Sequence, residues 1–508
     1  METFKPKKIL QILGALFCFE VLSYLVYLFP IFNWGVFIIL AIAFLIIALA
    51  DFKLATLILL AELFIGSKGY LFYFSAGGAI LSIRIMFWII IMSVWAAKVI
   101  IEWLKTKKFP LASLSKTKFL PALSLLAIFI IFGFINGLIR QNGFGNIFLD
   151  FNAWLFFALF FPFYSVFFAD IKRAENWENL KEVFFATALW LTLKTLFFLF
   201  CFAHNIPGTE QLYLWLRTTG VGEITEIGHG FYRLFFQSHI YLVWAFLFTA
   251  VWLAKKFALR DEAKTMLDGD GELTKRGHIV WTVIFGSAFL SVIILSLSRS
   301  FWVGLAGGLL LLAIIIWMKT SLRRLMLNLI HWLVMLAGAF IIIFAVAKFP
   351  FPPSVGGFDF SLLSQRTDLT SSDAAVNSRW ALLSALSQEL KESPIFGEGY
   401  GATVTYKSSD PRIVQSTTNG LYTTYAFEWG YLDIWLKLGL LGLIAYLGLL
   451  YIIFRRALKT STLKNNWLHL GVAAGILALA ITNIFTPYLN HPLGIGYLLL
   501  TCLLLSES

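Results

Sequence analysis

Long apolar runs recur along this chain and are separated by short segments that are polar or basic. Because an α-helix rises about 1.5 Å per residue, about 20 apolar residues cross the ~30 Å hydrocarbon core of a bilayer. The pattern predicts an all-α polytopic membrane protein with about 14 transmembrane helices. We expect these helices near 9–28, 33–50, 54–74, 79–104, 119–138, 148–169, 183–203, 233–254, 279–297, 301–318, 326–347, 431–454, 467–485 and 492–505.

One interruption of the pattern is much longer than the others and covers residues 348–430. Prolines at its start indicate that the chain leaves the membrane without a continuing helix. Further on, apolar residues at helical spacing predict a short amphipathic helix, with Asn377 or Ser378 as its N-cap and Ser393-Pro394 as its stop. The apolar positions are Trp380, Leu383, Leu386 and Leu390.

These breaks divide the chain into three parts. Residues 1–347 form transmembrane helices 1–11, with a smaller external loop at 204–232. Residues 348–430 form the long external loop with its short helix. Residues 431–508 form transmembrane helices 12–14.

Composition and charge agree with this assignment. Hydrophobic residues make up 59% of the chain and charged residues 13%, which excludes an ordinary soluble globule. A net charge of +12 would suggest nucleic acid as the partner of a soluble protein. Here the basic residues cluster in alternate loops, so we expect membrane lipids and no nucleic acid as partners.

The same distribution predicts the orientation of the chain, because basic residues favour the cytoplasmic side of a membrane. Both termini are then cytoplasmic, and residues 348–430 are external. The short loops assigned to the external side carry only a few basic residues, namely Lys68, Arg140, Arg217, Arg233 and Arg299.

The residue pattern predicts neither a cofactor nor a metal. All three cysteines lie in apolar runs, so no disulfide framework or zinc site is indicated. Asp268 and Asp270, in the cytoplasmic loop 255–278, imitate the D-x-D of nucleotide-sugar transferases. A solvated turn is the better interpretation, because such short matches often arise by chance.

We single out six ionisable residues inside the predicted spans, namely Glu20, Glu62, Arg84, Lys194, Asp433 and Lys437, because charge there is costly and indicates either function or pairing. Asp433 and Lys437 are four residues apart and face each other on one helix. Lys194 either lines a polar cavity or pairs with Glu20 or Glu62. Arg84 lies close enough to the outer end of its span either to reach the interface or to face an external site.

Two external arginines are stronger candidates for ligand contacts. Arg299 occupies a very short link between two spans, and Arg233 opens another span on the same side. A guanidinium suits phosphate oxygens because it makes two parallel hydrogen bonds. The alternative for both is an anchor to lipid headgroups.

The richest stretch for chemistry runs from 377 to 442. The glycines Gly397, Gly399 and Gly401 permit a tight turn or a close approach to a ligand. Glu428 then stands at the boundary where the long apolar helix begins near Tyr431.

This order of motifs resembles the O-antigen ligase and polymerase family of bacterial envelope glycan transferases. One half of the family signature has an arginine, a proline and a glycine run; the other has a tyrosine and two glycines after a histidine. The segment 296–304 resembles a further S-R-G motif, with Ser300 in place of the glycine. Glu428 stands at the histidine position. The matching residues are Arg379, Pro394, Gly397, Gly399, Gly401, Tyr431, Leu432, Gly439 and Gly442.

The resemblance implies an enzyme of the bacterial inner membrane with an external active site. It would move a glycan from a polyprenyl-diphosphate carrier to a hydroxyl on a lipid, glycan or protein acceptor, with inversion and without metal. Arg299 and Glu428 would be catalytic, Glu428 as the base. The substrate would contact Arg84, Arg233, Arg379, Tyr431 and the three glycines. The main alternative is a flippase or another transporter of lipid-linked glycans.

Overall fold

The computed structural model describes residues 5–76, 79–108, 114, 117–228, 231–263, 271–354, 374–409, 413–414, 417, 420–462 and 466–506. The Asp268–Asp270 pair lies outside these residues. Most of the regular structure is helical, and the described strands form three separate antiparallel hairpins. The prediction of an all-α polytopic membrane protein is confirmed.

Twelve helical segments among the described residues are long and apolar enough to cross a membrane. One of them, 144–169, is irregular and combines α6, a 3-10 turn (Trp154–Leu159), α7 and a π turn (Ser165–Ala169). The segments contain α1 (Pro6–Leu28), α2 (Asn33–Ala50), α4 (Ile83–Thr106), α5 (Leu120–Ile139), α6 (Phe144–Phe151), α7 (Phe160–Tyr164), α8 (Arg173–Ala203), α10 (Ile240–Ala263), α11 (Gly271–Leu295), α12 (Arg299–Lys319), α13 (Leu322–Ala347), α17 (Gly430–Thr460) and α18 (Trp467–Phe485).

The predicted count of 14 is not confirmed, because two of the expected helices are short. The run at 54–74 gives only α3 (Phe52–Ile65), which ends at Gly66 and is followed by a turn. The last helix, α19 (Pro492–Ser506), has 15 residues and rises about 22 Å, less than the ~30 Å core of a bilayer. The run at 79–104 begins as a hairpin of β1 (Tyr73–Ala76) and β2 (Ala79–Ser82), so its helix starts only at Ile83.

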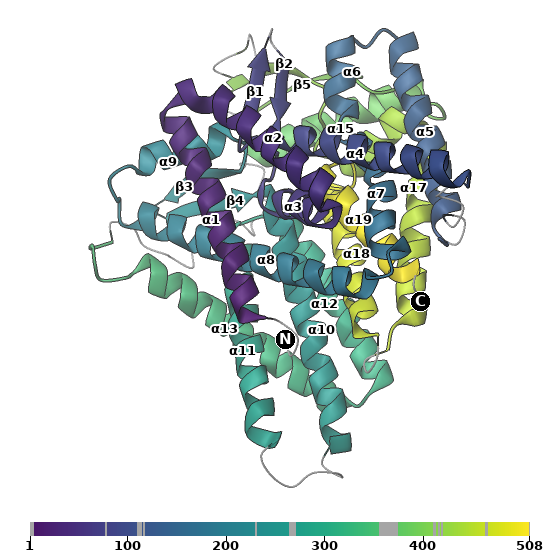
Figure 1. Cartoon of the computed structure of the whole chain (residues 1–508). Coiled ribbons are helices and arrows are strands. Elements are labelled where there is room, and N and C mark those ends of the chain that lie inside the picture. The colour runs from purple at the N-terminus through teal and green to yellow at the C-terminus, as the bar shows by residue number, and fades with distance from the viewer. Residues whose placement is uncertain are drawn as a thin grey trace.

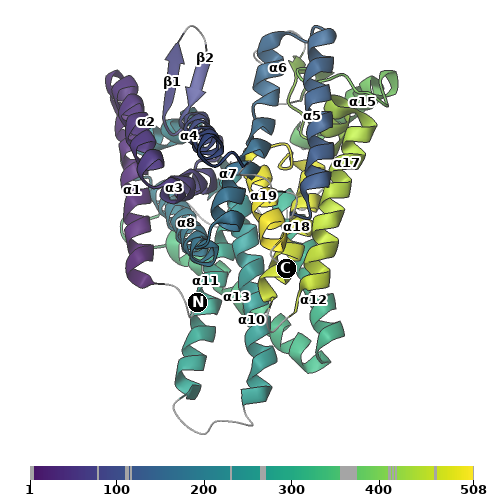
Figure 2. The same ribbon diagram turned by 45° about the vertical axis from the view of Figure 1, so that its right-hand side comes forward.

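The remaining elements lie between the long helices. They are α9 (Thr209–Thr218), the hairpin of β3 (Gly222–Gly228) and β4 (Phe231–Phe236), the helix α15 (Ala374–Glu392), and the hairpin of β5 (Val404–Lys407) and β6 (Leu421–Thr424). Figure 2 shows α15 and the β1–β2 hairpin at one end of the molecule and the adjoining ends of α10 and α11 at the other.

The amphipathic helix α15 exists, but two details of its prediction are wrong. It begins at Ala374, so neither Asn377 nor Ser378 is its N-cap, and the Ser378 hydroxyl instead accepts from the Ser409 amide at 2.8 Å. Its buried stripe is Leu382, Leu386 and Leu390, and Trp380 is 61% exposed. The stop at Ser393 agrees with the structure, since α15 ends at Glu392.

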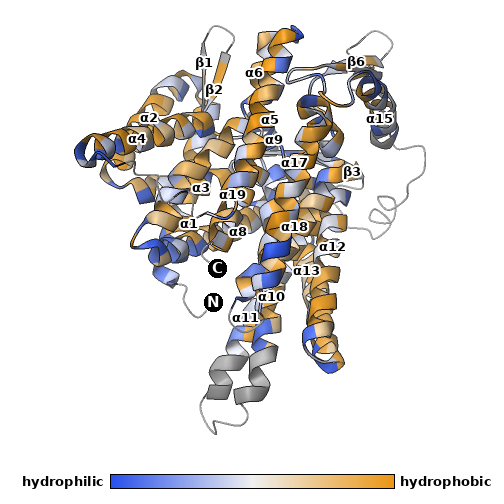
Figure 3. Cartoon of the chain, turned by 90° about the vertical axis from the view of Figure 1, so that its right-hand side faces the viewer, coloured by the Kyte–Doolittle hydropathy of each residue, from blue (hydrophilic) through white to orange (hydrophobic). Residues whose placement is uncertain are grey.

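The core lies around α10, α18 and α19, which are the helices surrounded most completely by others (Figure 1). Peripheral helices such as α1, α2 and α13 have only about a fifth of their positions buried inside the protein. Figure 3 shows the long helices hydrophobic over most of their length, while α15 carries many hydrophilic positions. An exposed apolar surface of this extent is what a helix presents to lipid.

Candidate functional site

A cavity of about 1560 Å³ lies at the end of the molecule that holds α15. We call it the arginine cavity. Its walls come from α9, the β3–β4 hairpin, the first turn of α12, α15, the β5–β6 hairpin and the end of α18. Arg233, Arg299, Arg379 and Glu428 all line it, although they are spread over almost 200 positions of the sequence.

The β3–β4 hairpin presents Arg233 because its strands alternate. Ile224 and Leu234 pair on one face and are buried. Thr225 and Arg233 pair at the next position, so their side chains lie on the opposite face, toward the cavity. Arg233 Nε donates to the Ser296 carbonyl oxygen at 3.0 Å, which joins this hairpin to the turn before α12.

Arg299 is the first residue of α12 and follows a tight turn from α11. In that turn Leu297 has a φ of 45°, a left-handed conformation that costs a residue with a Cβ about 1–2 kcal/mol. The Ser300 hydroxyl lies 3.0 Å from both Ser298 Oγ and Thr486 Oγ1. These contacts hold Arg299 at the cavity wall, where the N-terminal end of the α12 dipole adds partial positive charge.

Arg379 and Glu428, which also line the cavity, form an ion pair. Arg379 Nε donates to Glu428 Oε2, and the two side chains are 39% and 54% exposed. The other carboxylate oxygen, Glu428 Oε1, accepts no hydrogen bond from the described residues. The indole of Trp429 donates to the Arg379 carbonyl oxygen at 3.0 Å, so the segment before α17 is tied to α15. The pair therefore has a defined direction while both charges still face the cavity.

The cavity also contains polar and aromatic residues that the sequence analysis did not name individually as ligand contacts. Burial and the nearby carboxylate of Glu226 raise the pKa of Tyr232. The only signal in the sequence was their position in loops predicted to be external. The additional charged and aromatic lining residues are Glu210, Tyr213, Arg217, Glu223, Glu226, Tyr232, Trp380, Tyr406, Tyr422 and Trp429.

The three glycines of the 397–401 loop do not line the arginine cavity. Their φ angles are 68°, 79° and 79°, and each packs against the backbone of a neighbouring helix. Helix α17 is interrupted at Gly439, where φ is 75° and ψ is 173°. The loop enters this break, and the Leu440 amide donates to the Ile395 carbonyl oxygen at 3.0 Å.

Side chains at these glycines would collide with main-chain atoms. A Cβ at Gly397 would overlap the Leu436 carbonyl oxygen, and a Cβ at Gly439 would overlap that of Ile395. The glycine run therefore allows backbone to pack on backbone, and it satisfies polar groups that the break in α17 would leave bare inside a membrane.

The α5–α6 hairpin clamps the same loop from the other side. The Asn142 amide donates to the carbonyl oxygens of Glu398 and Tyr400, both at 2.9 Å. Arg140 pairs with the Glu398 carboxylate at 2.5 Å, and the Gly401 amide donates to Asp150 Oδ2 at 3.0 Å. None of these contacts was predicted, although Asp150 is conspicuous as an acidic residue in an apolar run.

Two further predicted site residues lie outside the arginine cavity. Arg84 is 2% exposed and makes a two-pronged ion pair with Glu62, through Nε at 2.9 Å and Nη2 at 3.1 Å. Tyr431 donates through its hydroxyl to the Ala480 carbonyl oxygen at 2.8 Å. The structure thus gives Arg84 and Tyr431 protein partners and does not bring them to the other four residues.

The remaining charges inside the spans are paired as the sequence allowed. Lys194 Nζ lies 2.6 Å from Glu20, and Lys437 Nζ lies 2.6 Å from Asp433. Lys437 also contacts Asp150 at 2.6 Å, so this cluster joins α6 to α17. Among the described residues, no group of three or more His, Cys, Asp or Glu side chains is arranged to hold a metal ion.

Comparison with known proteins agrees with the motifs. Residues 284–447 match the family model described as O-antigen ligase. The match runs from α11 into α17 and contains Arg299, Arg379 and Glu428, whereas Arg233 precedes it. No curated protein matches the chain. Over this segment, which is about a third of the chain, the protein is therefore similar to the O-antigen ligase family.

Proposed function

We propose that this protein transfers a glycan from a polyprenyl-diphosphate carrier to a hydroxyl of an acceptor, in the arginine cavity. The observation that carries the proposal is the convergence of Arg233, Arg299, Arg379 and Glu428 on one cavity. Transfer of this kind needs positive charge for a departing diphosphate and an acceptor for the proton of the attacking hydroxyl. The match of residues 284–447 to the O-antigen ligase family model supports the same class of reaction.

The arginines are proposed to hold the diphosphate. Arg299 stands at the N-terminus of α12, and Arg233 is anchored to the turn that precedes it. Guanidinium groups preorganised in a poorly hydrated site stabilise the charge that develops on the leaving group. This supply of positive charge is the basis for proposing metal-independent transfer.

Glu428 is proposed as the base that accepts the proton of the acceptor hydroxyl. Arg379 contacts only one of its carboxylate oxygens among the described residues, which leaves Oε1 for the hydroxyl. Attack on the face opposite the diphosphate would invert the anomeric carbon, as the family resemblance implies. The aromatic side chains of Trp380 and Trp429, whose rings are 6.2 Å apart, are proposed to contact sugar rings.

The site is proposed to face the periplasmic side of a bacterial inner membrane, with both termini cytoplasmic. The basic residues expected on the external side support this arrangement. Arg217, Arg233 and Arg299 line the arginine cavity, and Arg140 pairs with Glu398 just after α15. These residues therefore gather at one end of the molecule, and the α10–α11 hairpin lies at the other (Figure 2).

A transporter of lipid-linked glycans is the alternative, and the break in α17 favours it, because transporters use discontinuous helices at their binding sites. In this protein, however, the 395–401 loop fills the break and bonds to its backbone groups. The charged groups gather instead in a cavity at one end of the molecule, which favours chemistry at the membrane surface.

The test is transfer by the purified full chain in liposomes that contain a polyprenyl-diphosphate-linked oligosaccharide. Lipid, glycan and protein acceptors are supplied separately, and the anomeric configuration of the product is read by NMR. Release of the polyprenyl diphosphate with formation of an inverted glycoside is expected with one acceptor class. Movement of intact lipid-linked glycan across the bilayer, without a new glycoside, would replace the transferase by a transporter.

A further inference from the structure

A second cavity of about 360 Å³ lies between α8, α10, α11, α18 and α19, away from the arginine cavity. We call it the α10 groove. Its α10 lining comes from Tyr241, Ala245, Phe248, Trp252 and Lys255. These positions recur every three or four residues, so the groove follows one face of α10.

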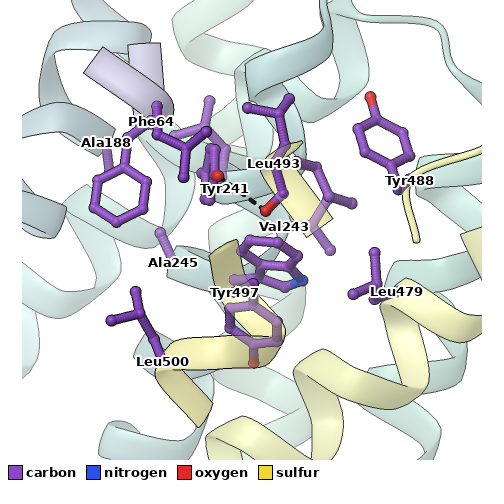
Figure 4. Packing of buried hydrophobic residues seen from close by; sticks show 14 of the residues in the cluster. Phe64, Ala188, Tyr241, Val243, Ala245, Leu479, Tyr488, Leu493, Tyr497 and Leu500 are labelled. Atoms are coloured by element: carbon purple, nitrogen blue, oxygen red, sulfur yellow. Dashed lines mark hydrogen bonds between the residues drawn. The ribbon is translucent and has the colours of Figure 1, made fainter. Parts of the chain in front are cut away.

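The length and lining of the α10 groove suit a hydrocarbon chain. From Tyr241 to Lys255 the helix rises about 21 Å, comparable with the ~15 Å of one leaflet of a bilayer core. Figure 4 shows Phe64, Tyr241, Ala245, Tyr497 and Leu500, which line the groove from α3, α10 and α19.

The polar groups of the lining are largely used by the protein itself. Thr249, Thr282 and Thr501 each donate to a carbonyl oxygen of their own helix, at distances of 2.7, 2.6 and 2.8 Å. Apart from the Tyr497 hydroxyl and the charged rim, the groove thus offers apolar surface. A cavity of this kind stays dry and accepts apolar ligands.

The rim of the groove carries positive charge and tryptophan. Lys255 lies 5.7 Å from the centre of the Trp467 ring, and Lys256 lies 4.9 Å from that of Trp252. Lys181 also lines the rim and pairs with Glu178 at 2.6 Å, so the charged residues that line the groove are two lysines and one carboxylate. Tryptophan and lysine together are typical of the level of lipid headgroups.

We propose that the α10 groove is a binding site for an anionic glycerophospholipid, at the end of the molecule opposite the arginine cavity. One acyl chain occupies the groove along α10, and the lipid phosphate lies at the rim beside Lys181 and Lys255. Basic pockets between transmembrane helices bind anionic headgroups in this way. The site takes no part in the proposed transfer, and its expected effect is to hold α8, α10 and α18 together.

The experiment titrates the full chain in detergent with phosphatidylglycerol and, separately, with phosphatidylethanolamine, and counts bound lipids by native mass spectrometry. Phosphatidylglycerol should bind more tightly. Because one lysine near an anionic lipid is worth about fivefold in binding, Lys181→Ala/Lys255→Ala should weaken phosphatidylglycerol about 30-fold. The matched control is Arg455→Ala/Lys459→Ala, which removes two exposed basic residues near the end of α17 and should change binding less than about twofold.

A second variant tests the chain-binding part of the groove. Thr249→Phe places a ring in the groove and keeps both lysines, so it should also release phosphatidylglycerol. Equal affinity for the two phospholipids, or equal binding by the double lysine variant and its control, would overturn the proposal. Displacement of phosphatidylglycerol by an equal concentration of polyprenyl phosphate would overturn the choice of a glycerophospholipid.

Discussion

Glu428→Gln separates a catalytic carboxylate from one that only pairs with Arg379. The substitution keeps the size of the side chain and one hydrogen bond but cannot accept a proton. The Arg379–Glu428 pair is 39% and 54% exposed, and exposed pairs contribute about 0.2–1 kcal/mol. Loss of the pair alone would therefore change transfer by about fivefold at most. Loss of a general base costs about 10²-fold or more, which corresponds to at least about 2.7 kcal/mol.

The assay is initial-rate transfer in liposomes at saturating donor and varied acceptor. Glu428→Gln should lower kcat about 10²-fold or more, with KM little changed. Arg379→Gln removes the same ion pair but leaves the carboxylate, so its main effect should be on the KM for the glycan substrate. Near-normal kcat in Glu428→Gln, with the protein folded in the membrane, would refute the catalytic role and leave a helix-terminal charge.

Three other substitutions or fusions test the remaining proposals. Arg299→Ala should abolish transfer while the protein accumulates in the membrane, and Arg299→Lys should restore only part of it, because an ammonium cannot bond phosphate with two parallel N–H groups; full activity in the alanine variant would reduce Arg299 to a headgroup anchor. Gly439→Ala places a Cβ against the Ile395 carbonyl oxygen in a conformation that favours glycine, so thermal unfolding in detergent should show a loss of about 2 kcal/mol or more, whereas Gly448→Ala on the same helix meets no neighbour and should not. A reporter fused within 355–375 should behave as external and one within 260–275 as cytoplasmic; reversed signals would place the arginine cavity on the other side of the membrane.

The sequence was most informative where apolar length or charged side chains carry the signal. Runs of apolar residues located most of the helices. Of the four charged cavity residues, Arg233 and Arg299 were noticed as charges at the predicted external ends of spans, and Arg379 and Glu428 through the resemblance to the family motifs. The helix expected at 54–74 was overestimated, because composition alone does not mark the end of α3 inside an apolar run. The bounds of α19 agree with the expected 492–505, but at 15 residues it is short for a span.

The contacts of some residues depend on how separate elements pack together, and the sequence does not reveal these contacts. Arg84 was predicted to reach an external site, and its pairing with Glu62 depends on how α3 packs against α4. The glycines Gly397, Gly399 and Gly401 allow either a ligand or another backbone to approach. Which of the two applies is decided by the break at Gly439 and by the α5–α6 hairpin, neither of which local spacing reveals.

The clamp formed by the α5–α6 hairpin limits how far the family segment can act as a module. Asn142 and Asp150 hold the 397–401 loop, yet they precede residues 284–447 by more than a hundred positions. In a chimera that takes only residues 284–447 from a relative, the glycine loop would come from the relative and the α5–α6 hairpin from this protein. The Asn142 carboxamide and the Asp150 carboxylate would then face a loop from another protein. We therefore expect a folded chimera to require the α5–α6 hairpin and residues 284–447 from the same protein, although the two segments are not contiguous in the sequence.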